Sequence, residues 1–396
     1  MKYEVITLGD VVTEIRNGID LEQFDRPTRT ATWPISRIET ISEARIDLDR
    51  VKYVSPTPQQ VQRYQLRAGD ILFSHINSPE HIGKTALFKG ERPLIHGINL
   101  LLIRTDISRC CPAYLDALLK SSSVRLHFRM RCKKAVNQAS LNQDDILSLQ
   151  IRLPCLSDQQ RVAKQLEQAD RQLHTRNYAL ELTDTFLPAL FLELFGDPQA
   201  NPRGWDGGII DDVVVFSQYG TSQKSNSASR GYPIVGMGNI TNRGSIDLFT
   251  YSHVDLSRDE FESLALQRGD IIFNRTNSTE LVGKTSYWNL DMDAVLASYL
   301  VRLRLKPEVL PEFFASLLNA GYFKNLFRDR CKKAVGQSNI SPTLLKEFPI
   351  YIPPLPLQQK FAAVVHRVER LRAVQREALR QAEHLFATLL HRAFSS

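Results

Sequence analysis

Apolar side chains recur at alternating steps of four and three residues in two segments, roughly 156–195 and 355–394. The first series runs Val162, Leu166, Ala169, Leu173, Arg176, Leu180, Thr183, Leu187, Leu190 and Leu194; the second runs Phe361, Val364, Val368, Leu371, Gln375, Ala378, Ala382, Leu385, Leu389 and Arg392. This spacing predicts two long helices whose stripes pack on each other as in a coiled coil. Pro188 is expected to kink or break the first helix near its end.

The segments before each predicted helix have a mixed pattern. Short apolar runs at 70–73 and 100–103, punctuated nearby by Gly, Pro and Asn, predict strands. Shorter helices are predicted at 112–119 and 311–318, each beginning with proline. These segments therefore read as α+β domains.

The chain contains its own sequence twice. Residues 66–88 (LRAGDILFSHINSPEHIGKTALF) match residues 266–288 (LQRGDIIFNRTNSTELVGKTSYW) at 11 of 23 positions, and RMRCKKAV at 129–136 matches RDRCKKAV at 328–335 at 7 of 8. Offsets of 200 and 199 indicate a duplicated domain. We predict two tandem α/β domains, 1–155 and 199–354, separated by two long antiparallel coiled-coil helices, 156–198 and 355–396. The internal repeat would then be pseudo-twofold, like the local symmetry of duplex DNA.

Composition adds a modest bias. The 396 residues are 43% hydrophobic and 23% charged, as expected of a folded protein, and the net charge of +7 mildly favours a polyanionic partner. Five cysteines without a CxxC pair or nearby histidines predict free, buried or half-buried thiols and no metal site. We find no signal peptide and no apolar run of membrane-spanning length, and expect a cytoplasmic protein.

The most tempting catalytic motif is Gly-Lys-Thr at 83–85, repeated at 283–285. A phosphate-binding loop needs a glycine five positions earlier, where this chain has Ser78 and Ser278. A contact of Lys84 and Lys284 with a phosphate backbone, or a simple turn, fits better. Motifs of dinucleotide-binding enzymes, amino-methyltransferases and nucleases are also missing, so we expect no catalytic residues, no metal and no cofactor on this chain.

A basic cluster occurs in both copies. It consists of Arg129, Arg131, Lys133 and Lys134 in the first copy and Arg328, Arg330, Lys332 and Lys333 in the second. Such runs are often solvated surface, but lysine and arginine also supply most of the affinity for duplex phosphates. Because the cluster is kept in two otherwise diverged domains, contact with a DNA backbone is an equally good interpretation.

Polar residues between the shared blocks differ from one copy to the other. Asn, Gln, Arg and His are the side chains that pair with base edges in the major groove. Ser74 and His75 of the first copy stand where the second has Asn274 and Arg275, and the loop 16–32 differs in length and sequence from the segment that contains Tyr219, Thr221, Ser222 and Lys224. Asn77 and Ser78, which recur as Asn277 and Ser278, are further candidates. A shared frame with divergent loops favours two readers of different short sequences, and ordinary loop drift is the alternative.

In this order, the motifs resemble those of the specificity subunits of type I restriction-modification systems, across essentially the whole chain. The similarity rests on the GDI[LI]F…GKT blocks, the segments 135–138 and 334–337, and the Gln-Gln pairs at 159–160 and 358–359. It also includes the stretch from Leu194 to Trp205. The chain departs from the family's usual Pro-Leu-x-Glu-Gln at the helix starts, where it has Leu-Ser-Asp-Gln-Gln and Leu-Pro-Leu-Gln-Gln.

The resemblance implies a DNA-binding subunit whose two target-recognition domains each read half of a bipartite site. The helices would set the spacer and dock two methyltransferase subunits, which use S-adenosylmethionine. ATP and Mg would be used by restriction subunits, which act as ATP-dependent translocases and endonucleases. The alternatives are a specificity subunit of a related system outside type I, a protein-binding scaffold, or a fused methyltransferase, for which no segment is left over.

Overall fold

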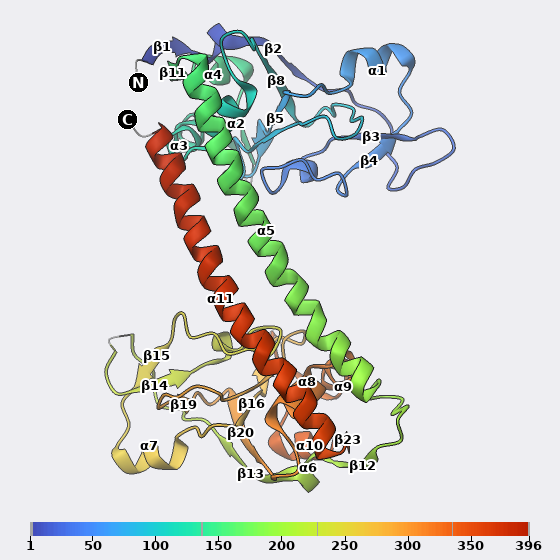
Figure 1. Cartoon of the computed structure of the whole chain (residues 1–396), viewed down its shortest axis with the longest axis vertical. Helices are drawn as coiled ribbons and strands as arrows, with labels where there is room; N and C mark the ends of the chain where they lie inside the picture. The colour runs from blue at the N-terminus through green and yellow to red at the C-terminus, as the bar shows by residue number, and fades with distance from the viewer. Residues whose placement is uncertain (1–2, 136–137, 228, 335, 395–396) are drawn as a thin grey trace. The chain divides into compact units, whose positions relative to one another are not determined.

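The computed structural model describes residues 3–135, 138–227, 229–334 and 336–394 (Figure 1). The chain divides into two compact units. Unit 1 comprises Met1–Arg176 and Ala378–Ser396, and unit 2 comprises Asn177–Glu377. Each unit therefore includes one globular part and a portion of each long helix.

Unit 1 is built on a four-stranded antiparallel sheet of order β2-β8-β5-β7 (Figure 1). Its elements are β1 Tyr3–Thr7, β2 Val12–Asn17, β3 Trp33–Ile35, β4 Lys52–Val54, α1 Pro58–Tyr64, β5 Ile71–Phe73, β6 Ile76–Asn77, β7 Thr85–Leu87, β8 Leu101–Thr105, α2 Pro112–Lys120, α3 Ser122–Arg131, β9 Lys133–Ala135, β10 Gln138–Ser140, α4 Gln143–Leu147 and β11 Gln150–Pro154. Short 3-10 turns lie at Leu8–Val11 and Glu39–Ile41.

Side chains of the central strand β5 alternate between two cores. Ile71 and Phe73 pack with α2 and α3, whereas Leu72 packs on the opposite face with Leu66 and Phe88. This alternation follows from the two-residue period of a strand. Because both faces of the sheet are covered, the strand needs an unbroken apolar run, which is the pattern found at 71–73.

Unit 2 repeats this topology with the order β13-β20-β16-β18. Its elements are β12 Asp206–Ile209, α6 Ile210–Val213, β13 Val214–Tyr219, β14 Tyr232–Val235, a 3-10 turn Met237–Asn239, β15 Ser252–Val254, α7 Arg258–Leu264, β16 Ile271–Asn274, β17 Thr276–Asn277, β18 Thr285–Tyr287, β19 Val295–Leu296, β20 Leu300–Leu305, α8 Pro311–Asn319, α9 Gly321–Arg330, β21 Lys332–Ala334, β22 Gln337–Asn339, α10 Pro342–Lys346 and β23 Pro349–Ile352. The duplication predicted from the sequence is thus a duplication of topology.

The two long helices are α5 (Leu156–Phe195) and α11 (Leu355–Phe394). Within unit 2, Phe361 of α11 packs against Phe195 of α5, and Arg372 bonds to Thr183. Residue numbers rise along one helix as they fall along the other, so the portions of α5 and α11 in unit 2 are antiparallel. The prediction of long antiparallel helices is confirmed.

Two details of the helix prediction are corrected. The helix α5 is not broken at Pro188 but continues to Phe195, and a kink at Pro188 stays a prediction. In α11, Leu371 and Leu385 are exposed at 49% and 46%, whereas Arg372 is buried. Arg372 takes the inward position because its guanidinium binds the hydroxyl and main-chain oxygen of Thr183 and the carboxylate of Asp184. The polar Thr183 on α5 is therefore hydrogen-bonded by the cationic Arg372 on α11.

The five cysteines are free, as predicted. Cys110, Cys132 and Cys331 are buried and Cys111 is half-buried, but Cys155 is exposed, against the expectation of burial. Among the described residues no group of three or more His, Cys, Asp or Glu could hold a metal ion. No helix in the described part of the chain is long and apolar enough to cross a membrane.

Candidate nucleic-acid interface

The aspartate of each repeated GDI block is buried in an ion pair. In unit 1, Arg104 donates from Nε and Nη2 to the two carboxylate oxygens of Asp70, both at 2.7 Å. In unit 2, Arg304 binds Asp270 in the same way at 2.8 and 3.0 Å. A forked arginine–carboxylate pair fixes both groups geometrically. This part of the repeat therefore holds the sheet together and presents no reactive group.

The Gly-Lys-Thr block forms a turn. Gly83 and Gly283 adopt positive φ values of 75° and 88°, a conformation that favours glycine. The ammonium group of Lys84 donates to the carbonyl of Ser42 at 2.7 Å, and that of Lys284 donates to the carbonyl of Ile240 at 2.6 Å. Burial lowers the pKa of both lysines. In this conformation both lysines hold neighbouring loops, and phosphate contact by them stays a prediction without support from this geometry.

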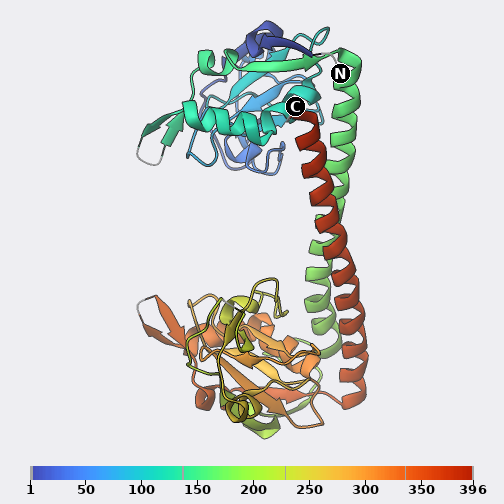
Figure 2. The ribbon, with the colours of Figure 1, turned by 90° about the vertical axis from the view of Figure 1, so that its left-hand side faces the viewer.

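The fold brings two distant candidate segments onto one small sheet. In unit 1, β6 pairs with β10, which pairs with β9, so Asn77 lies opposite Ala139 and Lys133 lies opposite Ser140. Unit 2 has the same arrangement in β17, β22 and β21. Figure 2 shows each of these sheets projecting from its own unit on the side away from the long helices. The loop after the central strand and the basic cluster are therefore neighbours.

The described members of the basic clusters lie at the end of a helix and the start of this projecting sheet. Arg129, Arg131, Lys133, Arg328, Arg330, Lys332 and Lys333 are all exposed. Arg129 also donates to the carbonyl of Glu80 at 2.8 Å, and Arg328 donates to Asn325. The structure does not describe the side chain of Lys134. It also does not describe Val136 and Asn137 of the first copy or Val335 of the second.

The candidates for base contact differ in how far their side chains are buried. Ser74 and Asn274 are fully buried and His75 is 8% exposed, so their side chains are not available to a duplex in this structure. Asn77 and Asn277 are half-buried, and each accepts a hydrogen bond at 2.8 Å from the amide of the following residue, Ser78 or Ser278, which are also half-buried. Tyr219, Ser222 and Lys224 are exposed, whereas Thr221 and Arg275 are half-buried. Contact of these residues with DNA stays a prediction.

Several residues that the sequence did not single out lie beside these candidates. A hollow of about 340 Å³ in unit 1 is lined by Ile38, Ile76, Asn77, Ser78, Asn99 and Gln138. Asn17 approaches His75, and the exposed Tyr299 lies in the turn that contacts Arg275. Asn17 lies in the divergent segment 16–32, but the sequence did not indicate that it meets His75. Only the pairing of strands reveals these neighbours.

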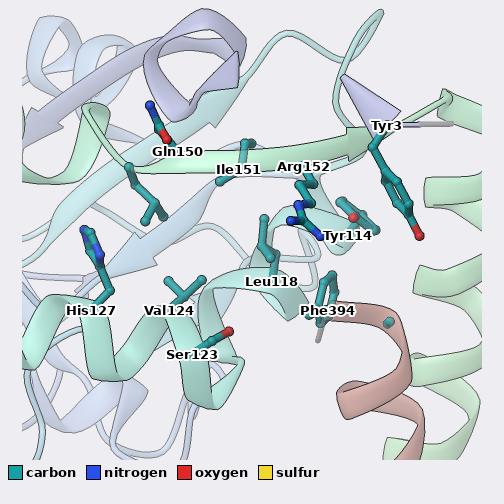
Figure 3. Close-up of a pocket in the computed structure, with 12 residues that line it drawn as sticks. Tyr3, Tyr114, Leu118, Ser123, Val124, His127, Gln150, Ile151, Arg152 and Phe394 are labelled. Carbon is teal, nitrogen blue, oxygen red and sulfur yellow. The ribbon is translucent and has the colours of Figure 1, made fainter. Parts of the chain in front are cut away.

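A second hollow in unit 1, of about 260 Å³, lies among β1, β11, α2, α3 and the end of α11 (Figure 3). Four of its lining residues are smaller than their counterparts 199 positions later. Ser123, Val124, Leu149 and Arg152 correspond to Tyr322, Phe323, Phe348 and Tyr351. In unit 2 the last three of these are buried in the core. The hollow is therefore a packing difference between the copies, on elements other than the projecting sheet.

Comparison with known proteins adds a family match. The model of the type I restriction modification DNA specificity domain matches residues 1–182 and again residues 202–384. The putative type I restriction enzyme MjaX specificity subunit of Methanocaldococcus jannaschii is 40% identical over 195 residues, which is 49% of this chain and 45% of that protein. The type I restriction enzyme EcoKI specificity subunit of Escherichia coli is 28% identical over 174 residues, 42% of this chain and 36% of that protein. The chain thus spans less than half the length of these curated relatives.

Solved structures share the fold. The type I restriction-modification S subunit from M. genitalium superposes with a TM-score of 0.66 over 100% of this chain and 96% of that one, at 14% identity. A chain from a structure of type I R-M complex assembly and conformational transition gives 0.52 over 99% and 97%, at 18% identity. The two family matches cover both globular parts and most of both helices, so the chain belongs to the type I restriction modification DNA specificity domain family.

Proposed function

We propose that this chain is the DNA-reading specificity subunit of a type I restriction-modification complex, with one half of a bipartite target read by each unit. The observation that carries the proposal is the projecting three-stranded sheet found once in each unit. Exposed arginines and lysines on β9 and β21, and at the ends of α3 and α9, lie beside polar loops that differ between the copies. Shared basic residues suit phosphate contact, and divergent polar residues suit base recognition.

The chain would recognise the DNA sequence and would not itself catalyse methyl transfer or cleavage. The lysines of the Gly-Lys-Thr blocks donate to loop carbonyls, and the aspartates of the GDI blocks are held in ion pairs. Methyl transfer with S-adenosylmethionine, and ATP- and Mg-dependent translocation and cleavage, would belong to the methyltransferase and restriction subunits. Purified chain alone is expected to transfer no methyl group to DNA.

The long helices offer a surface for docking a methyltransferase subunit. On α5, Tyr178, Leu182 and Phe186 are exposed at 57%, 52% and 48%, at a spacing of four residues that places them on one face. An exposed apolar stripe of this kind usually marks a contact with another protein. We expect Leu182→Glu with Phe186→Glu to abolish co-purification of the methyltransferase while the chain stays folded. Ile107→Glu is the control, because Ile107 is 74% exposed and lies between β8 and α2, outside both long helices.

The proposal is tested by selecting duplexes from a random library with the full chain, assembled with the methyltransferase subunits of its source. The expected result is enrichment of two short half-sites separated by a gap of fixed length and random sequence. Enrichment of no sequence, with intact assembly, would contradict DNA reading and favour the scaffold alternative.

A further inference from the structure

In each unit the residue that ends the edge strand of the main sheet meets a residue one or two positions after the central strand. Asn17 ends β2, and its Nδ2 lies 3.2 Å from Nε2 of His75. Tyr219 ends β13, and the guanidinium carbon of Arg275 lies 4.9 Å from its ring centroid. The strand registers make Asn17 and Tyr219 counterparts, and the repeat offset of 200 makes His75 and Arg275 counterparts.

The frame around this pair is the same in both units. Asn17 donates from Nδ2 to the carbonyl of Ile98 at 3.3 Å, and Arg275 donates from Nη1 to the carbonyl of Ser298 at 3.4 Å. Ile98 and Ser298 are again 200 residues apart. The two pairs thus differ in chemistry but are anchored on the same main-chain carbonyl.

The residue after each strand end is a glycine, and close approach of the backbone requires it. A Cβ at Gly18 would lie 2.2 Å from the carbonyl oxygen of His96, and a Cβ at Gly220 would lie 2.2 Å from that of Leu296. No side chain fits at such a distance. The glycine is therefore fixed, whereas the side chain just before it changes from asparagine to tyrosine.

Exposure separates the members of each pair. Asn17 is exposed and Tyr219 is 49% exposed, whereas His75 is 8% exposed and Arg275 is half-buried. The outer side chain faces solvent near the projecting sheet, and the inner one lies beneath it. The inner residue is held on the other side as well, because its carbonyl accepts a hydrogen bond at 2.9 Å from Leu141 in unit 1 and from Ile340 in unit 2.

We propose that Asn17 and Tyr219 are base-reading residues of the two units, and that His75 and Arg275 are the positioning residues that orient them. The proposal rests on the proposed function and deepens it, since it names one specificity-determining position in each half. The buried partner fixes the orientation of the exposed side chain, so the exposed side chain reads a base with little loss of conformational freedom.

The hydrogen bonds of Asn17 determine which of its side-chain atoms is left to contact a base. Both Nδ2 contacts, to the carbonyl of Ile98 and to Nε2 of His75, use the amide as donor, which leaves Oδ1 as an acceptor. His75 must be neutral with its proton on Nδ1 to accept this bond, and burial lowers the pKa of His75 accordingly. An acceptor in the major groove pairs with the amino group of adenine or cytosine. Tyr219 presents a hydroxyl and a ring edge at the same place, so the two units differ in the base they prefer there.

The test transplants the second pair into the first unit. The full chain carrying Asn17→Tyr with His75→Arg is assembled with its methyltransferase subunits and selected against a random duplex library beside the wild type. We expect the half-site read by unit 1 to change at one position, where the preference of the wild type for adenine or cytosine is lost. The half-site read by unit 2 should stay the same. Asn17→Ala should reduce discrimination at that position about 5-fold, the lower end of the range for a bidentate base contact, because only Oδ1 of Asn17 is left to contact the base.

His75 is tested by rescue. His75→Gln retains an acceptor for Nδ2 of Asn17 and should keep the wild-type base preference, whereas His75→Leu should lose it at equal thermal stability. If the wild type selects a bipartite site, and both Asn17→Ala and the transplant select the same half-sites, this inference is wrong. The proposed function would still hold. If the assembled wild type enriches no site, the proposed function itself fails, and this inference fails with it.

Discussion

His96 lies fully buried in unit 1, where its counterpart 200 residues later is Leu296. Its Nε2 lies 3.0 Å from the carbonyl of Leu100, which it satisfies as a donor. Burial lowers the pKa of His96 to about 4 and outweighs the hydrogen bond to the Leu100 carbonyl, which raises it. The residue is therefore a buried neutral imidazole at a position where the other copy uses an apolar side chain.

This difference predicts a pH dependence of stability. Because the folded pKa lies below the unfolded value of about 6.5, the stability is complete above pH 6.5 and falls as the pH drops toward 4. By pH 5 the loss due to His96 is about 2 kcal/mol, at about 1.36 kcal/mol per unit. We expect His96→Leu to lower the free energy of unfolding at pH 7, through loss of the Leu100 bond, but to reduce the further decrease at pH 5. Urea unfolding of both proteins at the two pH values measures this, and equal pH dependence would contradict it.

At the scale of elements, the fourth residue of each long helix is a glutamine whose side chain makes three hydrogen bonds to main-chain groups. Gln159 accepts from the amide of Cys111 at 2.8 Å and donates to the carbonyls of Arg109 and Pro154, both at 2.9 Å. Gln358 makes the equivalent bonds to Leu310, Glu308 and Pro353. Both side chains are fully buried. The first glutamine of each Gln-Gln pair thus ties the start of the helix to the loop before α2 or α8.

We expect Gln358→Ala to lower the free energy of unfolding by about 2–4 kcal/mol, because buried donors and acceptors lose their partners. The neighbouring Gln359 is exposed, so Gln359→Ala is the matched control and should change stability by no more than about 0.5 kcal/mol. Chemical denaturation of the two variants decides the matter. Similar effects at both positions would show that the three bonds contribute little.

The projecting sheet of unit 2 gives a prediction about salt. Changing Arg328, Arg330, Lys332 and Lys333 to alanine should weaken binding to all duplex sequences alike. Each lost phosphate contact should reduce the slope of log affinity against log salt by roughly 0.9. The control removes four exposed basic residues of α11 instead: Lys360, Arg367, Arg370 and Arg376. If the slope changes equally in both variants, general charge and not this cluster governs binding.

At the scale of the whole molecule, the boundary between the compact units falls inside both long helices, after Arg176 and after Glu377. Each helix has 40 residues, so at a rise of 1.5 Å per residue it is about 60 Å long. Readers on one face of a duplex prefer a separation of about one turn, 34–36 Å. Continuous helices are therefore long enough to act as the spacer between two half-sites.

Inserting four residues into α5 between Leu173 and Leu180 should lengthen the unread gap by one or two base pairs. Four residues add about one helical turn and nearly keep the phase of the buried stripe, whereas two would rotate it away. Methylome sequencing of cells carrying the assembled variant measures the gap. An active variant with the wild-type gap would refute the spacer role, and the two-residue insertion is expected to lose activity.

The sequence by itself determined the plan of the molecule. Periodicity gave the two long helices, because a packed helix needs an apolar residue every three or four positions. The offsets of 199 and 200 gave the duplicated domain, and GDI blocks with buried aspartates kept their spacing because the forked arginine pair requires it. The basic clusters were also found by repetition, and their described members are exposed, while phosphate contact by them stays a prediction.

Only the tertiary structure decided which individual side chains face outward and which neighbours they have. Ser74 and Asn274 looked equivalent to exposed loop residues but are buried, because Ser74 directly follows the central strand β5 and Asn274 is the last residue of the central strand β16. Arg372 lies inside and Leu371 outside, because a long-range bond to Thr183 outweighs the local apolar pattern. Asn17 reaches His75 across 58 residues through strand pairing. Periodicity records contacts within one element, whereas such contacts depend on how separate elements pack.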